Sequence, residues 1–304
     1  MKLFLAGAND KRKCEIIYNS NHPYLLSTFF VHQNGFNKDW IYWYNKTSKR
    51  GASWIMDSGL FTMMFGAGSN KTYTEKDLLE YTYKYLNNLK KIKYKDYIVE
   101  MDVHKVLGLQ ALKKFRKIFE EQYPLKKTIF VWHVEEKEEG FRELCKKYPY
   151  IAISIPELRI VLKGRRTLKN AVKHLIKVAN DINPNIKIHL LGCNDINILS
   201  QKGYYSCDAS DWISTSRWKN GGTIWVGKKY KRMTIHTRLW KRYFKENKYK
   251  IMSEKLANKL YKTEKMKESY LNLGVNILSF TRMNQYINNR FFNYEKVKKL
   301  KDEN

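Results

Sequence analysis

The apolar residues of this chain gather in short runs that alternate with amphipathic segments. Seven runs, rich in β-branched side chains and each closed by a polar or small residue, predict strands over residues 2–7, 53–58, 97–104, 128–135, 150–154, 187–193 and 205–210. Apolar positions recur at helical spacing over residues 73–92 and 167–181. Thr74 and Asp77 form a capping-box signature at the start of the first of these helices.

Strand followed by helix, repeated at least five times, predicts a parallel sheet with helices outside it. The seven runs, with residues 223–226 as a candidate eighth, suit an α/β fold of the (β/α)8 TIM-barrel type better than an open sheet. Gly7 is followed by Ala8, Asn9 and Asp10, so the glycine-rich loop of a dinucleotide-binding fold is missing after the first strand.

Charge divides the chain into two parts. The 304 residues include 58 Lys and Arg against 29 Asp and Glu, a formal net charge of +29. Residues 228–304 carry 21 Lys and Arg against 7 Asp and Glu, so about half of the excess lies there, in a segment whose pattern is mostly helical. We expect a catalytic barrel over residues 1–227 and a basic helical extension over 228–304 that packs on the barrel and contacts a polyanion such as nucleic acid.

Other features exclude several classes of protein. The apolar runs are far shorter than the roughly 20 residues that cross a bilayer, so no membrane segment is expected. The first seven residues are too short for the apolar part of a signal peptide. The four cysteines lie far apart in the sequence, without the close pairs of a structural zinc site, and are expected to be reduced. The sequence therefore indicates a cytoplasmic protein.

Two aspartates close predicted strands at points where the following residues are small. Asp57 precedes a Ser-Gly pair, and Asp208 lies in a Cys-Asp-Ala-Ser segment. Active sites of (β/α)8 barrels lie where the loops after the strands surround one mouth, so both carboxylates are expected there. Two acids suit a displacement in two steps at a sugar carbon, in which one attacks the anomeric carbon and the other moves protons. The alternative is that Asp57 only caps the next turn.

A second group of polar residues follows two neighbouring strands. Strand alternation predicts that Glu100, Asp102 and His104 share one face, and His133 lies at the end of the next strand. These residue types fit a metal-dependent barrel hydrolase or a hydrogen-bonding wall for a bound base. A purely structural role for His133 stays open.

Taken together, residues 53–212 resemble the guanine transglycosylases, the queuine or archaeosine tRNA-ribosyltransferase superfamily. The most specific piece runs from Asp57 through Ser58 to Phe61, with Leu60 where the family usually has a second Gly. The resemblance implies a barrel enzyme that exchanges guanine for a 7-deazaguanine base. By this resemblance Asp57 is the acid/base, Ser58 helps to hold the base, and Phe61 stacks on one side of it.

Other strand ends carry the same resemblance. Asp102 is similar to the family's acid that reads the guanine edge, and Leu191-Gly192 resembles the Met-Gly pair whose apolar side chain closes the other face of the base. His133 stands where the family commonly has Gln, and Ser154 stands where it has Gly. Both departures concern how the base is recognised.

The region around Asp208 indicates which branch of the family is closest. Asp208 is similar to the family's nucleophile, but the zinc site that the tRNA enzymes carry downstream of it, with three closely spaced Cys and a His, has no counterpart because no Cys follows Cys207. We therefore expect neither a metal nor another cofactor. A short, basic, zinc-free member resembles the DpdA-type branch of phages and bacterial genomic islands, which inserts 7-deazaguanines into DNA.

The resemblance implies a DNA-guanine transglycosylase, a pentosyltransferase that acts on DNA and a base such as 7-cyano-7-deazaguanine. Asp208 would attack C1′ of a target guanosine, and Asp57 would move the protons. One alternative is a tRNA-guanine transglycosylase. Another, of a different class, is a non-catalytic nucleic-acid-binding barrel in which Asp57 and Asp208 are structural.

Overall fold

Eight parallel strands close into a barrel in a computed structural model, which describes residues 1–65, 72–213, 223–226, 229–232 and 236–292. The strands follow one another in chain order, and β1 closes the barrel against β8. They are β1 (Lys2–Ala6), β2 (Tyr24–Thr28), β3 (Ser53–Asp57), β4 (Tyr97–Val99), β5 (Thr128–Trp132), β6 (Tyr150–Ser154), β7 (Lys187–Leu191) and β8 (Ser206–Ala209). The predicted (β/α)8 TIM barrel is therefore confirmed.

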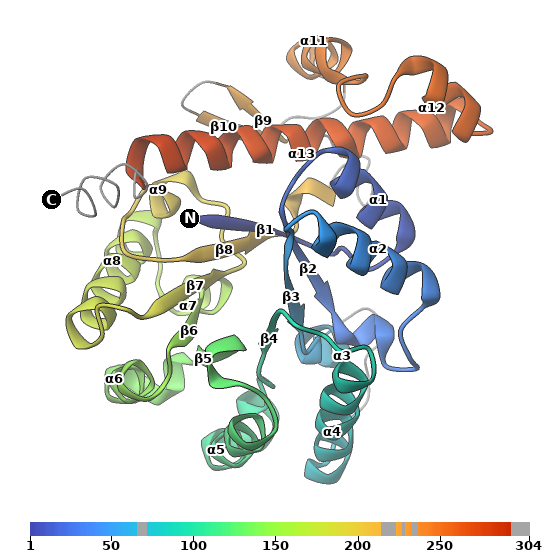
Figure 1. Ribbon diagram of the computed structural model, residues 1–304. Coiled ribbons are helices and arrows are strands. Elements are labelled where there is room, and N and C mark those ends of the chain that lie inside the picture. The colour runs from blue at the N-terminus through green and yellow to red at the C-terminus, as the bar shows by residue number, and fades with distance from the viewer. Residues whose placement is uncertain (66–71, 214–222, 227–228, 233–235, 293–304) are drawn as a thin grey trace, which may run out of the picture.

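Helices surround the strands, as the view along the barrel in Figure 1 shows. They are α1 (Lys11–Asn19), α2 (Lys38–Lys49), α3 (Leu60–Phe65), α4 (Glu75–Lys91), α5 (His104–Gln122), α6 (Lys137–Lys147), α7 (Ile155–Val161), α8 (Arg165–Ile182) and α9 (Ile196–Leu199), with 3-10 turns η1 (Phe29–His32), η2 (Leu125–Lys127), η3 (Val134–Glu136) and η4 (Asp211–Ile213). The predicted capping box is present, because Thr74 accepts from the N–H of Asp77 while Asp77 accepts from that of Thr74. Among the described residues, we find no helix that combines the length and apolar character needed to span a membrane.

Strand alternation sorts the side chains into two layers. Those of Phe4, Ile55, Val131 and Tyr150, among others, fill the barrel interior. Their neighbours along the strands pack outward against the helices in a much larger cluster. Because both faces of each strand are buried, the strands read as continuous apolar runs, which is why most of them could be predicted.

The second strand was missed, and the candidate eighth strand was wrong. β2 (Tyr24–Thr28) pairs with β1 and β3, but its sequence Tyr-Leu-Leu-Ser-Thr ends in two polar residues and follows a proline. Residues 223–226 instead form β9 (Thr223–Val226), which pairs antiparallel with β10 (Lys229–Arg232) outside the barrel. β9 and β10 form a separate two-stranded sheet, so neither strand belongs to the barrel.

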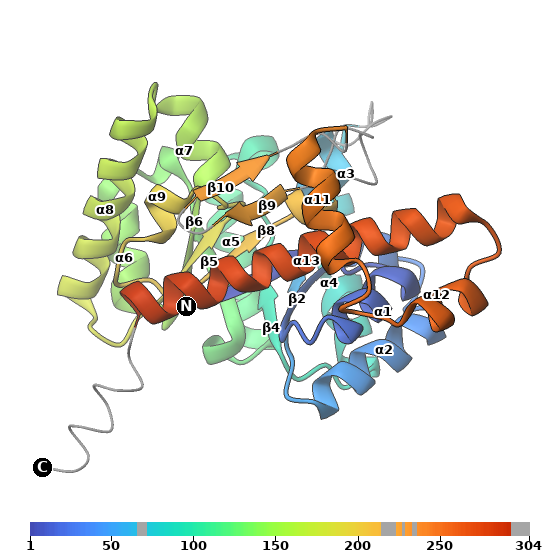
Figure 2. The same ribbon diagram turned by 90° about the horizontal axis from the view of Figure 1, so that it is seen from above.

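The chain after the hairpin is helical and packs on the barrel beside β1 and β8 (Figures 1 and 2). It forms α11 (Arg238–Asn247), α12 (Glu254–Leu260) and the long α13 (Glu264–Phe291). The buried ring of His22 joins α13 to the first strand, with Nδ1 3.0 Å from Thr281 Oγ1 and Nε2 2.8 Å from the Leu3 carbonyl. Asn276 of α13 donates to the carbonyl of Trp212 after β8 at 3.0 Å. Through these contacts, α13 covers the outer side of the barrel where β1 meets β8.

Candidate active site

The strand-end residues singled out in the sequence come together because the carboxyl ends of all eight strands face one mouth. Asp57 ends β3, Asp208 lies in β8, and Leu191 ends β7. Asp102 follows β4, and His133 follows β5. The mouth is therefore lined by polar groups from four strands and by Leu191 from a fifth.

Asp208 is held by donors from the neighbouring strand β7. Its Oδ1 accepts from the backbone N–H of Gly192 at 2.7 Å and lies 3.2 Å from Nε2 of His189. The His189 ring is completely buried, and only 8% of Asp208 is exposed. Both of these contacts reach Oδ1, so the carboxylate is oriented while Oδ2 takes no part in either.

The His189 ring is itself oriented by a chain of two hydroxyl groups. Its Nδ1 lies 2.7 Å from Ser206 Oγ, which lies 2.6 Å from the hydroxyl of Tyr150. For a neutral imidazole, one direction of donation satisfies this chain: the Tyr150 hydroxyl donates to Ser206, Ser206 donates to Nδ1, and Nε2–H donates to Asp208. Four side chains from β6, β7 and β8 thus form one hydrogen-bonded relay that ends on Asp208.

Asp57 carries a carboxyl whose ionisation is disfavoured. Burial, together with the negative charge of Asp208, raises the pKa of Asp57 to about 6, although N–H groups of Gly59 and Ser58 act in the opposite direction. A buried carboxyl that holds its proton more tightly than usual is suited to donate that proton, whereas the oriented carboxylate of Asp208 is suited to act as a nucleophile.

Asp102 and His133 present unsatisfied polar atoms to each other. Asp102 Oδ1 and His133 Nε2 are buried, lack a hydrogen-bond partner among the described residues, and lie 3.6 Å apart. Burial, with the nearby carboxylates of Asp57 and Glu100, raises the pKa of Asp102 well above its usual value. Burial also lowers the pKa of His133. Unpaired buried polar atoms are costly, so this pair indicates a ligand-binding position.

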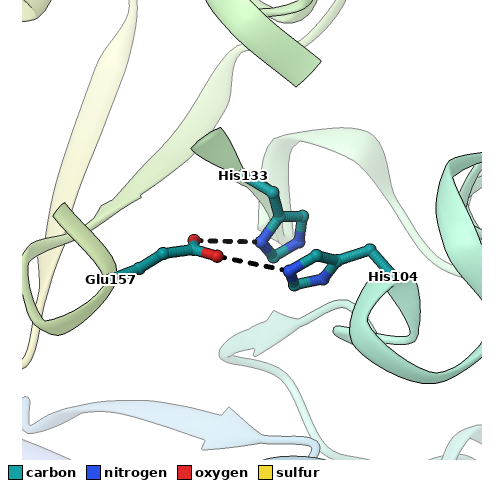
Figure 3. Close-up of side chains that lie close together, drawn as sticks. All are labelled: His104, His133 and Glu157. Atoms are coloured by element: carbon teal, nitrogen blue, oxygen red, sulfur yellow. Dashed lines mark hydrogen bonds and ion pairs between the residues drawn. The ribbon is translucent and has the colours of Figure 1, made fainter. Parts of the chain in front are cut away.

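Beside Asp102 and His133, the Glu157 carboxylate lies between His133 and a second histidine, His104, as Figure 3 shows. His104 and His133 stack with ring centroids 3.5 Å apart, and the Glu157 carboxylate faces both rings. Glu157 lies 3.3 Å from His104 Nε2 and 3.4 Å from His133 Nδ1. Burial opposes ionisation of Glu157, but hydrogen bonds from the two imidazoles and Lys105 hold its pKa below the usual range. The three residues are also arranged such that they could hold a metal ion.

Ser58, Gly59 and Phe61 follow β3. Ser58 is buried, and its carbonyl accepts from the Tyr81 hydroxyl at 2.8 Å. Gly59 has φ +76°, and a Cβ there would lie 2.2 Å from Thr28 Oγ1, so the turn after Asp57 requires glycine. Phe61, in the first turn of α3, exposes 71% of its surface. The stacking role of Phe61 stays a prediction.

Two strand-end residues have structural partners. Ser154 caps α7, because its hydroxyl accepts from the N–H of Glu157 at 3.3 Å. Gly192 adopts φ +59°, and a Cβ there would lie 2.9 Å from Pro156, so the backbone fits closely while it donates to Asp208. Leu191 is half-buried and packs beside the barrel interior. The hydrogen bond from Gly192 to Asp208 had no counterpart in the sequence interpretation.

Glu100 does not share a face with Asp102 and His104, so this expectation was wrong. β4 ends at Val99, and the pleat does not continue to the start of α5 at His104. Glu100 instead accepts from Arg116 of α5 at 3.1 Å and from the N–H of Val131 at 2.7 Å. Arg116 also pairs with Glu136. Burial lowers the pKa of the Arg116 guanidinium, but the charges of Glu100 and Glu136 outweigh this effect and raise that pKa. Glu100 therefore belongs to a buried ion-pair network outside the mouth.

An exposed basic face lies on α11. Arg238, Lys241, Arg242 and Lys245 are exposed and recur at i, i+3, i+4 and i+7, so they share one side of the helix. On the opposite side, Trp240 is buried against Ile224 and Val275. Figure 2 shows α11 at the end of the barrel where α3 and α7 follow their strands. Positive charge thus lies at the same end of the barrel as the acidic mouth.

Comparisons with known proteins give no family for this chain. No family model matches the chain, and no curated protein matches it. Among solved structures, a GH18 chitinase from Pseudoalteromonas aurantia is similar with a TM-score of 0.45 and 11% sequence identity, over 71% of this chain and 98% of that chain. A likeness at this level says nothing about the site.

Proposed function

We propose that this protein is a DNA-guanine transglycosylase that exchanges a guanine in DNA for a 7-deazaguanine base. The observation that carries the proposal is the pair of mouth carboxyls: Asp208, oriented through Oδ1, and Asp57, whose raised pKa keeps a proton available. With a pKa of about 6, roughly a tenth of Asp57 is protonated at pH 7. Resemblance to the guanine transglycosylases adds support from the sequence.

The reaction takes two displacements at one carbon. Asp208 Oδ2 attacks C1′, the C1′–N9 bond breaks, and guanine leaves with the proton of Asp57 on N9. The incoming 7-deazaguanine then gives its N9 proton to Asp57, its N9 attacks C1′, and the Asp208–C1′ ester bond breaks. Asp57 ends protonated and Asp208 ionised, as both began.

The wall formed by Asp102 and His133 supports recognition of the base. The Watson–Crick edge of guanine offers donors and an acceptor, and 7-deazaguanines keep that edge. The unpartnered Asp102 Oδ1 and His133 Nε2 would pair with it. C1′ inside a stacked duplex is out of reach, so the target nucleotide would be flipped out or taken from a single strand. The basic face of α11 would hold phosphates on either side.

Base exchange tests the proposal directly. Duplex DNA is incubated with the enzyme and 7-cyano-7-deazaguanine, and the nucleosides are then analysed by mass spectrometry. We expect the deaza nucleoside in DNA from the wild type and a loss of at least about a thousandfold in Asp208→Asn, since the amide is a poor nucleophile. Asp195→Asn is the matched control, because the Asp195 side chain caps α9 and accepts from the Asn197 amide, and Asn keeps an oxygen for both contacts.

Two outcomes would decide for the alternatives. Unchanged exchange in both Asp208→Asn and Asp57→Asn would overturn the double displacement. Incorporation into tRNA alone, when tRNA and DNA are offered side by side, would replace DNA by tRNA as the substrate. Nucleic-acid binding without any exchange, over a panel of 7-deazaguanines, would indicate a binding protein.

A further inference from the structure

We propose that His104, His133 and Glu157 form a binding site for one divalent transition-metal ion of the zinc type. The site lies in the barrel mouth. The resemblance implied no metal, and the metal-dependent alternative in the sequence analysis included Glu100 and lacked Glu157. Its three residues come from the start of α5, the end of β5 and the first turn of α7. Two imidazole nitrogens and one carboxylate oxygen are a donor set that zinc uses in proteins.

The distances agree with such a site. The ligand atoms lie within 4.8 Å of one another, and the carboxylate oxygens are 3.3 and 3.4 Å from the two ring nitrogens. Neighbouring ligand atoms of a tetrahedral zinc ion, each about 2.1 Å from the metal, lie about 3.4 Å apart. A small rotation of the stacked rings would bring both lone pairs onto one ion. Three protein ligands leave a fourth position open.

Unsatisfied atoms beside the cluster provide an independent argument. When Glu157 accepts an N–H from each ring, the outer nitrogens His104 Nδ1 and His133 Nε2 carry no proton, and both are buried without a partner among the described residues. A metal on the inner nitrogens moves the ring protons to the outer ones. His133 Nε2–H then faces Asp102 Oδ1 at 3.6 Å, so a carboxylate supports a metal-bound histidine in the usual way.

Lys105 is the competing cation. Its Nζ lies 3.0 Å from Glu157 Oε1, and it also pairs with Glu135. The Lys105 side chain is 44% exposed, so it can turn to Glu135 when a metal enters. Replacing Lys105 by Met should therefore strengthen metal binding, because a like charge is removed from beside the ion.

The metal would also define the chemistry of the base-binding wall. A metal on Nδ1 makes His133 Nε2–H a donor. When a base is bound, this N–H would turn from Asp102 to the carbonyl oxygen on the guanine edge, and Asp102 would accept hydrogen bonds from the neighbouring N–H groups of that edge. This consequence rests on the proposed function, whereas metal binding itself does not.

Metal titration of the full chain tests the site without any nucleic acid. After chelator treatment, we expect calorimetry to show one equivalent of Zn²⁺ bound in the micromolar range or tighter, and Co²⁺ to give the visible bands of a four-coordinate nitrogen–oxygen site. His104→Ala and Glu157→Gln should each weaken binding at least tenfold, while Lys105→Met should strengthen it. His174→Ala is the control, since His174 is an exposed histidine paired with Glu138 on the outer surface.

The same experiment can overturn the proposal. Absence of saturable Zn²⁺ binding to the wild type would do so, as would binding that neither His104→Ala nor Glu157→Gln weakens. Urea unfolding identifies a variant that fails to fold. In that case the Co²⁺ spectrum of the wild type is the test, and a wild type without the bands of a four-coordinate nitrogen–oxygen site would overturn the proposal. Base exchange is measured separately, so an empty metal site leaves the transglycosylase proposal standing.

Discussion

Replacing Asp57 by Asn should stabilise the fold at neutral pH. Asp57 ionises with difficulty, since burial and the charge of Asp208 raise its pKa from 3.8 to about 6. At about 1.4 kcal/mol per pH unit, that difference corresponds to about 3 kcal/mol between the protonated and ionised forms. Asparagine keeps the shape and an acceptor oxygen for the N–H groups of Ser58 and Gly59 but carries no charge.

The sign of the pH dependence follows from proton linkage. The folded protein binds the Asp57 proton more tightly than the unfolded chain, so the wild type loses stability as the pH rises from about 4 to about 6. The amide does not titrate. The free energy of unfolding of Asp57→Asn minus that of the wild type should therefore increase by about 2–3 kcal/mol between pH 4 and pH 8.

Urea unfolding followed by tryptophan fluorescence at several pH values measures this difference. Asp181→Asn, on the exposed surface of α8 beside Lys177, controls for the change from carboxylate to amide and should show little trend. A difference that stays flat across the range, or that falls as the pH rises, would refute the assignment of Asp57 as a carboxyl strained by burial and by Asp208.

Three further predictions concern other parts of the molecule. Arg116→Met should lower the free energy of unfolding by about 3–5 kcal/mol, because it leaves the buried carboxylates of Glu100 and Glu136 unpaired, whereas loss of the exposed Arg142 should leave the urea midpoint unchanged. His189→Phe should reduce kcat for base exchange about 10–100-fold with little change in KM. The variant removes one hydrogen bond to the charged form of Asp208 but leaves Asp102 and His133 unchanged. An equal rise in KM would contradict this positioning role. The double variant Lys241→Ala, Lys245→Ala should weaken DNA binding and lower the slope of log K against log salt by about 1.8. Fluorescence anisotropy measures both quantities. The double variant Lys255→Ala, Lys259→Ala, on α12, is the control.

Most of the barrel could be predicted because buried strands leave an apolar record in the sequence. β6 was predicted at its observed bounds, and six others were found with ends that differ by up to five residues. β2 escaped because Tyr-Leu-Leu-Ser-Thr has only two aliphatic residues before it becomes polar, so it does not stand out as an apolar run. The hairpin strand β9 has the same local pattern as a barrel strand, and only its antiparallel partner β10 distinguishes it.

The site was predictable only where a residue ends its own strand. Asp57, Asp102, His133 and Asp208 reach the mouth because strand direction alone brings them there. The partners that orient them come from other elements and depend on register: His189 meets Ser206 because the two are paired across β7 and β8. Glu157 turns back toward the mouth because Ser154 starts a helix at that point. Local patterns do not contain these pairings.

The order of synthesis gives the closure of this barrel a cost in folding. β1 is made first, but its partner β8 and the covering helix α13 come from the last third of the chain. Until then the nascent sheet has two unpaired edges, at β1 and β7, which can pair with other chains. Contacts of such long sequence separation form slowly. We therefore expect refolding yield to fall as protein concentration rises, and chaperones that shield open sheet edges to raise it.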